Sequence, residues 1–124
     1  MKARILIIED NEQNMYLTTF ILEKHGYQVL QARNGVDGVR IAREQDPDLI
    51  LLDIQLPVMD GYAVARELRK IESLADKHII AVTSYAMPGD REHALESGCS
   101  GYIEKPIDPD TFIGQIEHYL QNSL

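Results

Sequence analysis

Residues of types that can bind cations and phosphate groups end or follow the apolar runs of this sequence. They are, in chain order, Glu9, Asp10, Asp53, Thr83 and Lys105. Carboxylates coordinate hard cations, while an ammonium group and a hydroxyl stabilise phosphoryl oxygens. If the fold brings these residues together, the sequence encodes a site for phosphoryl chemistry.

Carboxylates gathered without a counter-charge repel one another. Two unit charges about 4 Å apart repel by roughly 4 kcal/mol at an effective dielectric constant of about 20. A proton or a cation must relieve this repulsion among Glu9, Asp10 and Asp53. Mg²⁺ suits such a set because it takes one or two carboxylates and keeps water or phosphate oxygens for the rest. No histidine or cysteine is near these positions in the sequence, so Zn²⁺ is not expected.

Asp53 is the candidate nucleophile, because a carboxylate can form an aspartyl-phosphate. Lys105 would place positive charge on the phosphoryl oxygens, and the Thr83 hydroxyl would donate a hydrogen bond to one of them. Each residue alone has a simpler structural explanation, since acids at strand ends are often helix caps or solvated loop residues. Their coincidence at four strand ends favours the chemical interpretation.

Five short apolar runs alternate with segments typical of helices. The runs are Ile5–Ile8, Tyr27–Ala32, Leu49–Leu52, Ile79–Thr83 and Gly101–Ile103. Near-continuous Ile, Leu and Val is typical of parallel strands covered on both faces. Strict alternation predicts an α/β protein, a three-layer (βα)5 domain whose helices cover both faces of a parallel sheet. In such sheets the working site lies at the carboxyl ends of the strands, where the polar residues fall.

The helical segments carry their own sequence signals. Helical spacing is found in Leu17, Phe20 and Ile21, in Val64, Leu68 and Ile71, and most clearly in Phe112, Ile113, Ile116, Tyr119 and Leu120. Turn and cap residues separate the segments: Gly26, Asn34-Gly35, Asp46-Pro47, Gly98 and Asp108-Pro109.

The composition limits the partners. The 124 residues fit one ordinary domain, and 20 acidic residues against 12 basic ones give a formal net charge of -8. An acidic surface repels nucleic acid and anionic membranes, so we expect neither as a partner. The apolar stretch of MKARILIIED is too short for a signal peptide or a membrane span. We therefore expect a soluble, cytoplasmic protein, as a monomer or weak dimer.

The chain has a lone cysteine, Cys99, which excludes an internal disulfide and suits a reducing compartment. Because it lies among small residues in SGCSG, a packing role is a simpler interpretation than a catalytic thiol.

The ordered set of site residues resembles the receiver domain of two-component response regulators. The strings DIQLPVMDG, AVTSYAM and KPI carry the resemblance, which covers essentially the whole chain, residues 1–124, as a single receiver domain. It implies the flavodoxin-like receiver fold with strand order 2-1-3-4-5. EDNEQNM, PDLILLDIQLP and GCSGYIEKPI are similar to stand-alone receivers of the DivK type, and the chain also resembles receiver modules excised from hybrid histidine kinases. Because nothing follows Leu124, we expect no output domain.

The resemblance implies a chemical role for each residue of the site. Asp53 would be the phosphorylated residue. Glu9, Asp10 and Asp53 would hold Mg²⁺, with the backbone carbonyl of Gln55 as a further ligand. Lys105 would pair with the phosphoryl oxygens.

The resemblance also implies a switch. Thr83 would move toward the phosphoryl group, and Tyr102 would turn inward with it. The Lys105–Pro106 peptide bond would be cis. A face from about Met87 to Leu120 would be read by a downstream protein target. A second surface around the first helix, with residues Asn11, Asn14 and Met15, would dock the phosphodonor.

Together these roles describe a phosphorylation-controlled switch in a phosphorelay. A histidine kinase or histidine phosphotransfer protein would supply the phosphoryl group from a phosphohistidine. The domain would not be an enzyme, but it would catalyse its own phosphoryl transfer and slow autodephosphorylation. A receiver-like scaffold that binds partners independently of phosphorylation stays open, because the presence of these residues does not prove their use.

Rival functions fit the residues less well. A phosphatase of the haloacid dehalogenase type needs a second aspartate two residues after the nucleophile, and that position is Gln55. A flavodoxin needs a Ser/Thr/Gly-rich phosphate loop after the first strand, whereas IIEDNEQN is acidic and repels phosphate without a metal.

Overall fold

The computed structural model describes residues 3–56, 60–84 and 88–122. Its strands are β1 (Arg4–Ile8), β2 (Gln28–Ala32), β3 (Leu49–Asp53), β4 (His78–Thr83) and β5 (Gly101–Glu104). Its helices are α1 (Glu12–Lys24), α2 (Gly35–Gln45), α3 (Gly61–Arg69), α4 (Asp90–Ser97) and α5 (Pro109–Gln121), and a short 3₁₀ helix, η1 (Glu72–Leu74), precedes β4.

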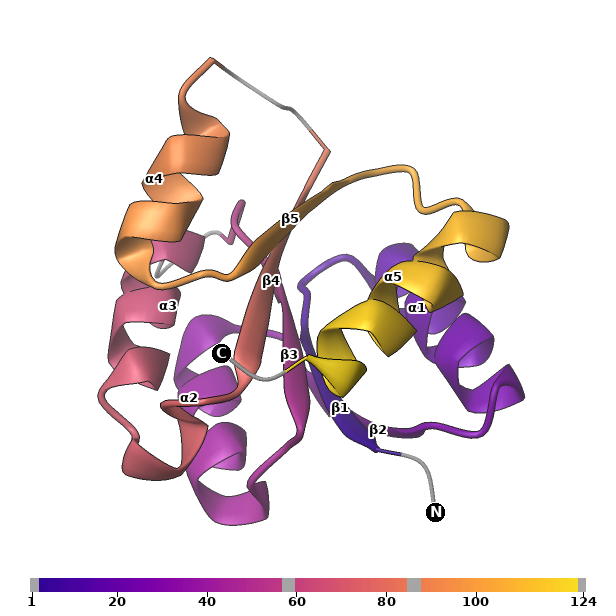
Figure 1. The fold of residues 1–124 in the computed structure, drawn as a ribbon, viewed down its shortest axis with the longest axis horizontal. Helices are drawn as coiled ribbons and strands as arrows, with labels where there is room; N and C mark the ends of the chain where they lie inside the picture. The colour runs from indigo at the N-terminus through magenta and orange to yellow at the C-terminus, as the bar shows by residue number, and fades with distance from the viewer. Residues whose placement is uncertain (1–2, 57–59, 85–87, 123–124) are drawn as a thin grey trace.

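The strands form one parallel sheet in the order β2-β1-β3-β4-β5. Helices α1 and α5 cover one face of this sheet, and α2, α3 and α4 cover the other (Figure 1). The three-layer (βα)5 fold and its strand order are therefore confirmed. Because all strands run in one direction, their carboxyl ends lie along one edge of the sheet.

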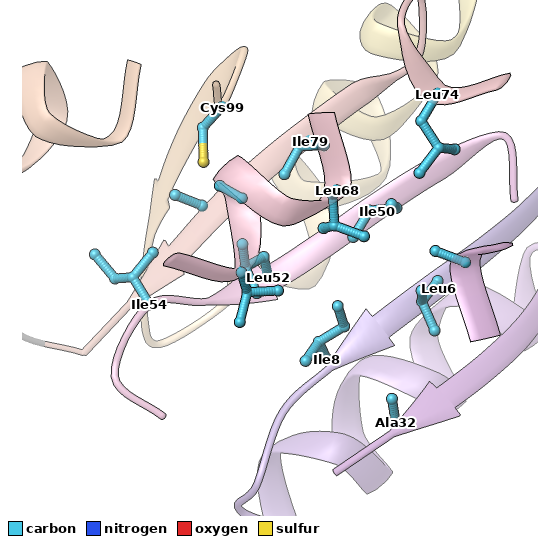
Figure 2. Close-up of a cluster of buried hydrophobic side chains, with 14 of the residues drawn as sticks. Leu6, Ile8, Ala32, Ile50, Leu52, Ile54, Leu68, Leu74, Ile79 and Cys99 are labelled. Atoms are coloured by element: carbon cyan, nitrogen blue, oxygen red, sulfur yellow. The ribbon is translucent and has the colours of Figure 1, made fainter. Parts of the chain in front are cut away.

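Alternate residues of each strand enter two separate cores, as the twofold period of a strand requires. Leu6, Ile8, Ile50 and Leu52 pack toward α2, α3 and α4 in the cluster that Figure 2 shows. Their neighbours face α1 and α5, in a cluster that includes Ile5, Ile7, Leu49, Leu51, Leu22, Phe112 and Ile116. Burial of each large apolar side chain contributes about 1.5–3 kcal/mol, so the central strands are firmly fixed.

Side chains cap the starts of four helices. Asn11, Asn34, Asp60 and Asp108 each accept a backbone hydrogen bond from the first turn of the helix that follows. Helix α4 differs, because its preceding residue is Gly89, with a positive φ of 88° and no side chain to offer. The predicted boundaries at Asn34-Gly35, Gly98 and Asp108-Pro109 are confirmed.

The prediction that Ile71 continues the third helix is wrong. Helix α3 ends at Arg69, and Ile71 has extended backbone angles (φ −81°, ψ 118°) before η1. Ile71 is nevertheless only 9% exposed. Its apolar spacing reflects contact with the core and not continuation of the helix.

The first helix is less buried than its apolar spacing suggests. Leu17 and Phe20 are 44% and 54% exposed, whereas Met15, Ile21 and Leu22 are buried. Met15 is only 1% exposed, so the expectation that it lies on a docking surface is wrong. Residues three and four apart share a face of a helix, and Met15 belongs to the stripe that faces the sheet.

Candidate functional site

The three acidic residues at the ends of β1 and β3 lie together. One carboxylate oxygen each from Glu9, Asp10 and Asp53 falls within 4.8 Å of the others. Glu9 and Asp53 are each 5% exposed, and Asp10 is exposed. The sheet brings them together because β1 and β3 are neighbours and Ile8 pairs with Leu52, one position before Glu9 and Asp53.

Lys105 reaches this cluster from the segment after β5. Its Nζ contacts Glu9 Oε1 and lies 3.7 Å from Asp53 Oδ2. The Lys105 side chain is 9% exposed, so its charge acts in a poorly hydrated setting. The Lys105–Pro106 peptide bond is cis.

One ammonium group faces several carboxylates, and the charge of the cluster is therefore unbalanced. Burial, together with the neighbouring Asp53, raises the pKa of Glu9 to about 7, although Lys105 opposes the shift. A buried carboxylate with a raised pKa indicates that the site lacks positive charge. The all-oxygen set of ligands fits a hard divalent cation such as Mg²⁺.

Backbone groups hold the carboxylates in place. The N–H of Gln55 donates to Asp53 Oδ1 at 2.8 Å, and the N–H of Asn11 donates to Glu9 Oε2 at 3.3 Å. Gln55 is itself exposed, and its Oε1 accepts a hydrogen bond of 3.2 Å from the N–H of Ser84. The loop after β3 is thereby tied to the end of β4.

Thr83 and Tyr102 lie on the neighbouring strands β4 and β5. Thr83 is the last residue of β4 and is fully buried, and its carbonyl accepts a 2.7 Å hydrogen bond from the N–H of Lys105. Tyr102 is half-buried, and among the residues that the structure describes its hydroxyl has no hydrogen-bond partner. All the predicted site residues thus lie at or near one edge of the sheet.

The sequence analysis did not identify a polar cluster between α3 and α4. Tyr62 donates a hydrogen bond of 3.1 Å to Asp90 Oδ1, and its ring stacks on that of His93 at 3.7 Å between centroids. No sequence signal joins Tyr62 to Asp90, since 28 positions separate them and neither belongs to a motif.

A family model for the response regulator receiver domain matches residues 5–117 of the chain. The chain belongs to this family and is a receiver domain of two-component signalling. It is similar to the polar-differentiation response regulator DivK of Brucella anthropi, with 44% identity over 120 residues that cover 97% of this chain and 98% of that protein. DivK of Brucella ovis is 44% identical over the same coverage.

Solved structures agree with this assignment. The receiver domain of the sensor histidine kinase PA1611 from Pseudomonas aeruginosa, with magnesium in its active-site cleft, is 35% identical, with a TM-score of 0.91 over 98% of this chain and 100% of that one. A CheY-like receiver domain protein from Methanospirillum hungatei is 30% identical, with a TM-score of 0.90 over 98% and 95% of the two chains.

None of the helices in residues 3–56, 60–84 and 88–122 has the length and apolar character needed to span a bilayer.

Proposed function

We propose that Asp53 accepts a phosphoryl group from a phosphohistidine of a histidine kinase or phosphotransfer protein. The observation that carries this proposal is the buried Asp53 carboxylate with Glu9, Asp10 and Lys105 around it. A carboxylate oxygen of Asp53 attacks phosphorus, an O–P bond forms and the P–N bond breaks. The electron pair of that bond stays on the imidazole nitrogen of the donor, and the product is an acyl phosphate.

The carboxylates of Glu9, Asp10 and Asp53, with the backbone carbonyl of Gln55, are the groups that would hold Mg²⁺. When bound, the ion would offset the negative charge of the carboxylates and of the transferred phosphoryl group. The raised pKa of Glu9 and the 4.8 Å grouping of the oxygens support this assignment.

The other side chains of the site would stabilise the transferred group. Lys105 Nζ, 3.7 Å from Asp53 Oδ2, would compensate the charge of phosphoryl oxygens bonded at that carboxylate. Thr83 and Tyr102 would then change position, and the face formed by α4, β5 and α5 would be read by a downstream protein. Met87, the expected start of this face, lies outside the described residues.

The exposed side of α1 would receive the phosphodonor. Tyr16, Leu17 and Phe20 are 67%, 44% and 54% exposed, and they lie on the helix that follows Glu9 and Asp10. A groove of about 730 Å³ lined by residues of α1 and α5 adjoins Leu17 and Phe20. We place the domain in the cytoplasm, where histidine kinases present their phosphohistidine.

Incubation with acetyl phosphate and Mg²⁺, followed by intact-mass measurement, tests the proposal. We expect a gain of one phosphoryl group, and no gain with EDTA or in the Asp53→Asn variant. An unphosphorylated wild-type protein, shown to be folded and to bind Mg²⁺, would contradict the transfer chemistry. The domain would then be a scaffold whose partner binding ignores phosphorylation.

A further inference from the structure

A polar stripe on α3 holds α4 to the rest of the molecule. Tyr62, Arg66 and Arg69 are spaced by four and three residues, so they share one face of α3. Tyr62 binds Asp90 at the start of α4, and Arg66 donates to Ser97 Oγ at 3.3 Å near its end. Arg69 donates to the carbonyl of Gly98, the residue after α4, at 2.7 Å.

The two ends of α4 are not held equally. Arg69 also donates to the carbonyls of Leu74 and Lys77 at 2.8 and 2.7 Å, so the segment after α4 is tied into a backbone network. At the start of α4, Tyr62 offers one hydrogen bond and a stacked ring. The buried side chains of α4 are the small ones of Ala94 and Ser97, both in its second half. The start of α4 can therefore move at little cost in apolar burial.

A second tyrosine, on the same face of the sheet, lacks a hydrogen-bond acceptor among the described residues. Tyr102 and Tyr62 pack against the same apolar cluster. Among the described residues, nothing accepts a hydrogen bond from the buried Tyr102 hydroxyl. The negative charge of Asp90 contributes, after the larger effect of burial, to a raised pKa of both tyrosines.

We propose that Asp90 is an acceptor with two positions, bound to Tyr62 in this structure and to Tyr102 in a second arrangement of α4. Tyr62 is then a positioning residue that holds the first arrangement. A buried hydroxyl without a partner costs free energy, so the second arrangement recovers at Tyr102 much of what it loses at Tyr62. A small difference in free energy between two arrangements is what a switch requires.

The exchange of Asp90 between the two tyrosines would connect the phosphoryl site with α4. This role in regulation rests on the proposed function. Tyr102 lies on β5, two residues before Glu104, whose partner in β4 is Thr83. A change at Thr83 that moves Tyr102 toward Asp90 would release Tyr62 and the start of α4. The exchange of hydroxyl partners itself needs no phosphoryl group.

A double-mutant cycle on the unphosphorylated protein tests the exchange. Urea unfolding is measured for wild type and for Tyr62→Phe, Tyr102→Phe and the double variant, because Phe keeps both rings and removes one hydroxyl at a time. In wild type, Tyr102→Phe should leave the unfolding equilibrium constant unchanged or lower it. In the Tyr62→Phe background, the same change should raise that constant roughly three- to tenfold, because it removes the new bond to Asp90.

Amide hydrogen exchange of the Asp90–Ser97 segment supplies a local measurement. Tyr62→Phe should speed exchange at His93, the first hydrogen-bonded amide of α4, more than at the end of the helix, while Tyr16→Phe, a matched change at an exposed tyrosine, should not. An identical effect of Tyr102→Phe in both backgrounds would overturn the proposal. Intact-mass measurement after acetyl phosphate treatment tests the proposed function independently. An absence of phosphorylation would reject that function, but the double-mutant cycle would still show whether the two tyrosines exchange Asp90.

Discussion

Helices α5 and α4 flank the same strand, β5, but they are attached by different forces. Helix α5 begins with an Asp108 cap and proline at its first position, and it buries Phe112, Ile113 and Ile116. Helix α4 begins after a glycine, buries small side chains, and is held largely by hydrogen bonds from α3. Apolar burial fixes α5, whereas the position of α4 depends on a few polar contacts that can be exchanged.

The same contrast separates the interior of the sheet from its carboxyl edge. Apolar residues such as Ile50 and Leu52 fix the strands, and the buried members of the two cores include none of the site residues. At the edge, Glu9 and Asp53 are buried beside one ammonium group, an arrangement that costs stability because their charges are not fully compensated. The responsive parts of the molecule are therefore those held by charge and hydrogen bonds.

The largest expected effect is in α5. Phe112→Ala removes a side chain that is 1% exposed and leaves a cavity between α5 and the sheet. We expect a loss of about 3–5 kcal/mol in the free energy of unfolding, measured by urea titration. Leu95→Ala in α4, where the side chain is 46% exposed, is the control and should cost much less. Equal losses would contradict the contrast between the helices.

The next effect is expected at the fixed end of α4. Arg69→Ala removes the guanidinium donor from the carbonyls of Gly98, Leu74 and Lys77, of which Leu74 keeps the N–H of Lys77 as a second donor. We expect a loss of about 2–3 kcal/mol, because the carbonyls of Gly98 and Lys77 lose this donor together and Leu74 loses one of two. Arg66→Ala removes a single 3.3 Å contact with Ser97 and should cost less than about 1 kcal/mol. If both variants were equally stable, the carbonyl contacts of Arg69 would not be what fixes this end of α4.

A smaller effect concerns pH and the carboxyl edge. The pKa of Glu9 is raised to about 7 from 4.5, so its favourable contribution is complete below pH 4.5 and is lost as the pH rises through 7. Without metal, the melting temperature should therefore fall between pH 5 and pH 8 by more in wild type than in Glu9→Gln. Added Mg²⁺ should stabilise wild type more at pH 8 than at pH 5. If the melting temperature of Glu9→Gln fell with pH as much as that of wild type, the Glu9 carboxylate would not be the cause of the lost stability.

The sequence predicted the parts of the molecule that follow from alternation. Because apolar runs and helical segments alternate, the strand ends had to meet, and Asp53 and Lys105 could be placed at one edge from their positions alone. Contacts between side chains far apart in sequence could not be predicted: Tyr62 with Asp90, or Arg69 with Gly98, depend on how α3 and α4 pack. The burial of Met15 could not be predicted either. Apolar residues occur on both the buried and the exposed side of α1, so the sequence does not show which side faces the sheet.

The smallest expected effect is at Cys99, directly after the fixed end of α4. The thiol is 4% exposed, and burial raises its pKa to about 11, from the usual 9. A shift of this size lowers the thiolate fraction at pH 8 by about 100-fold, so a thiol reagent should modify the native protein far more slowly than the unfolded chain. Tyr62→Phe should leave this slow rate unchanged, because it frees the start of α4 and not the segment bound by Arg69. Faster modification in that variant, at unchanged global stability, would mean that α4 detaches as a whole.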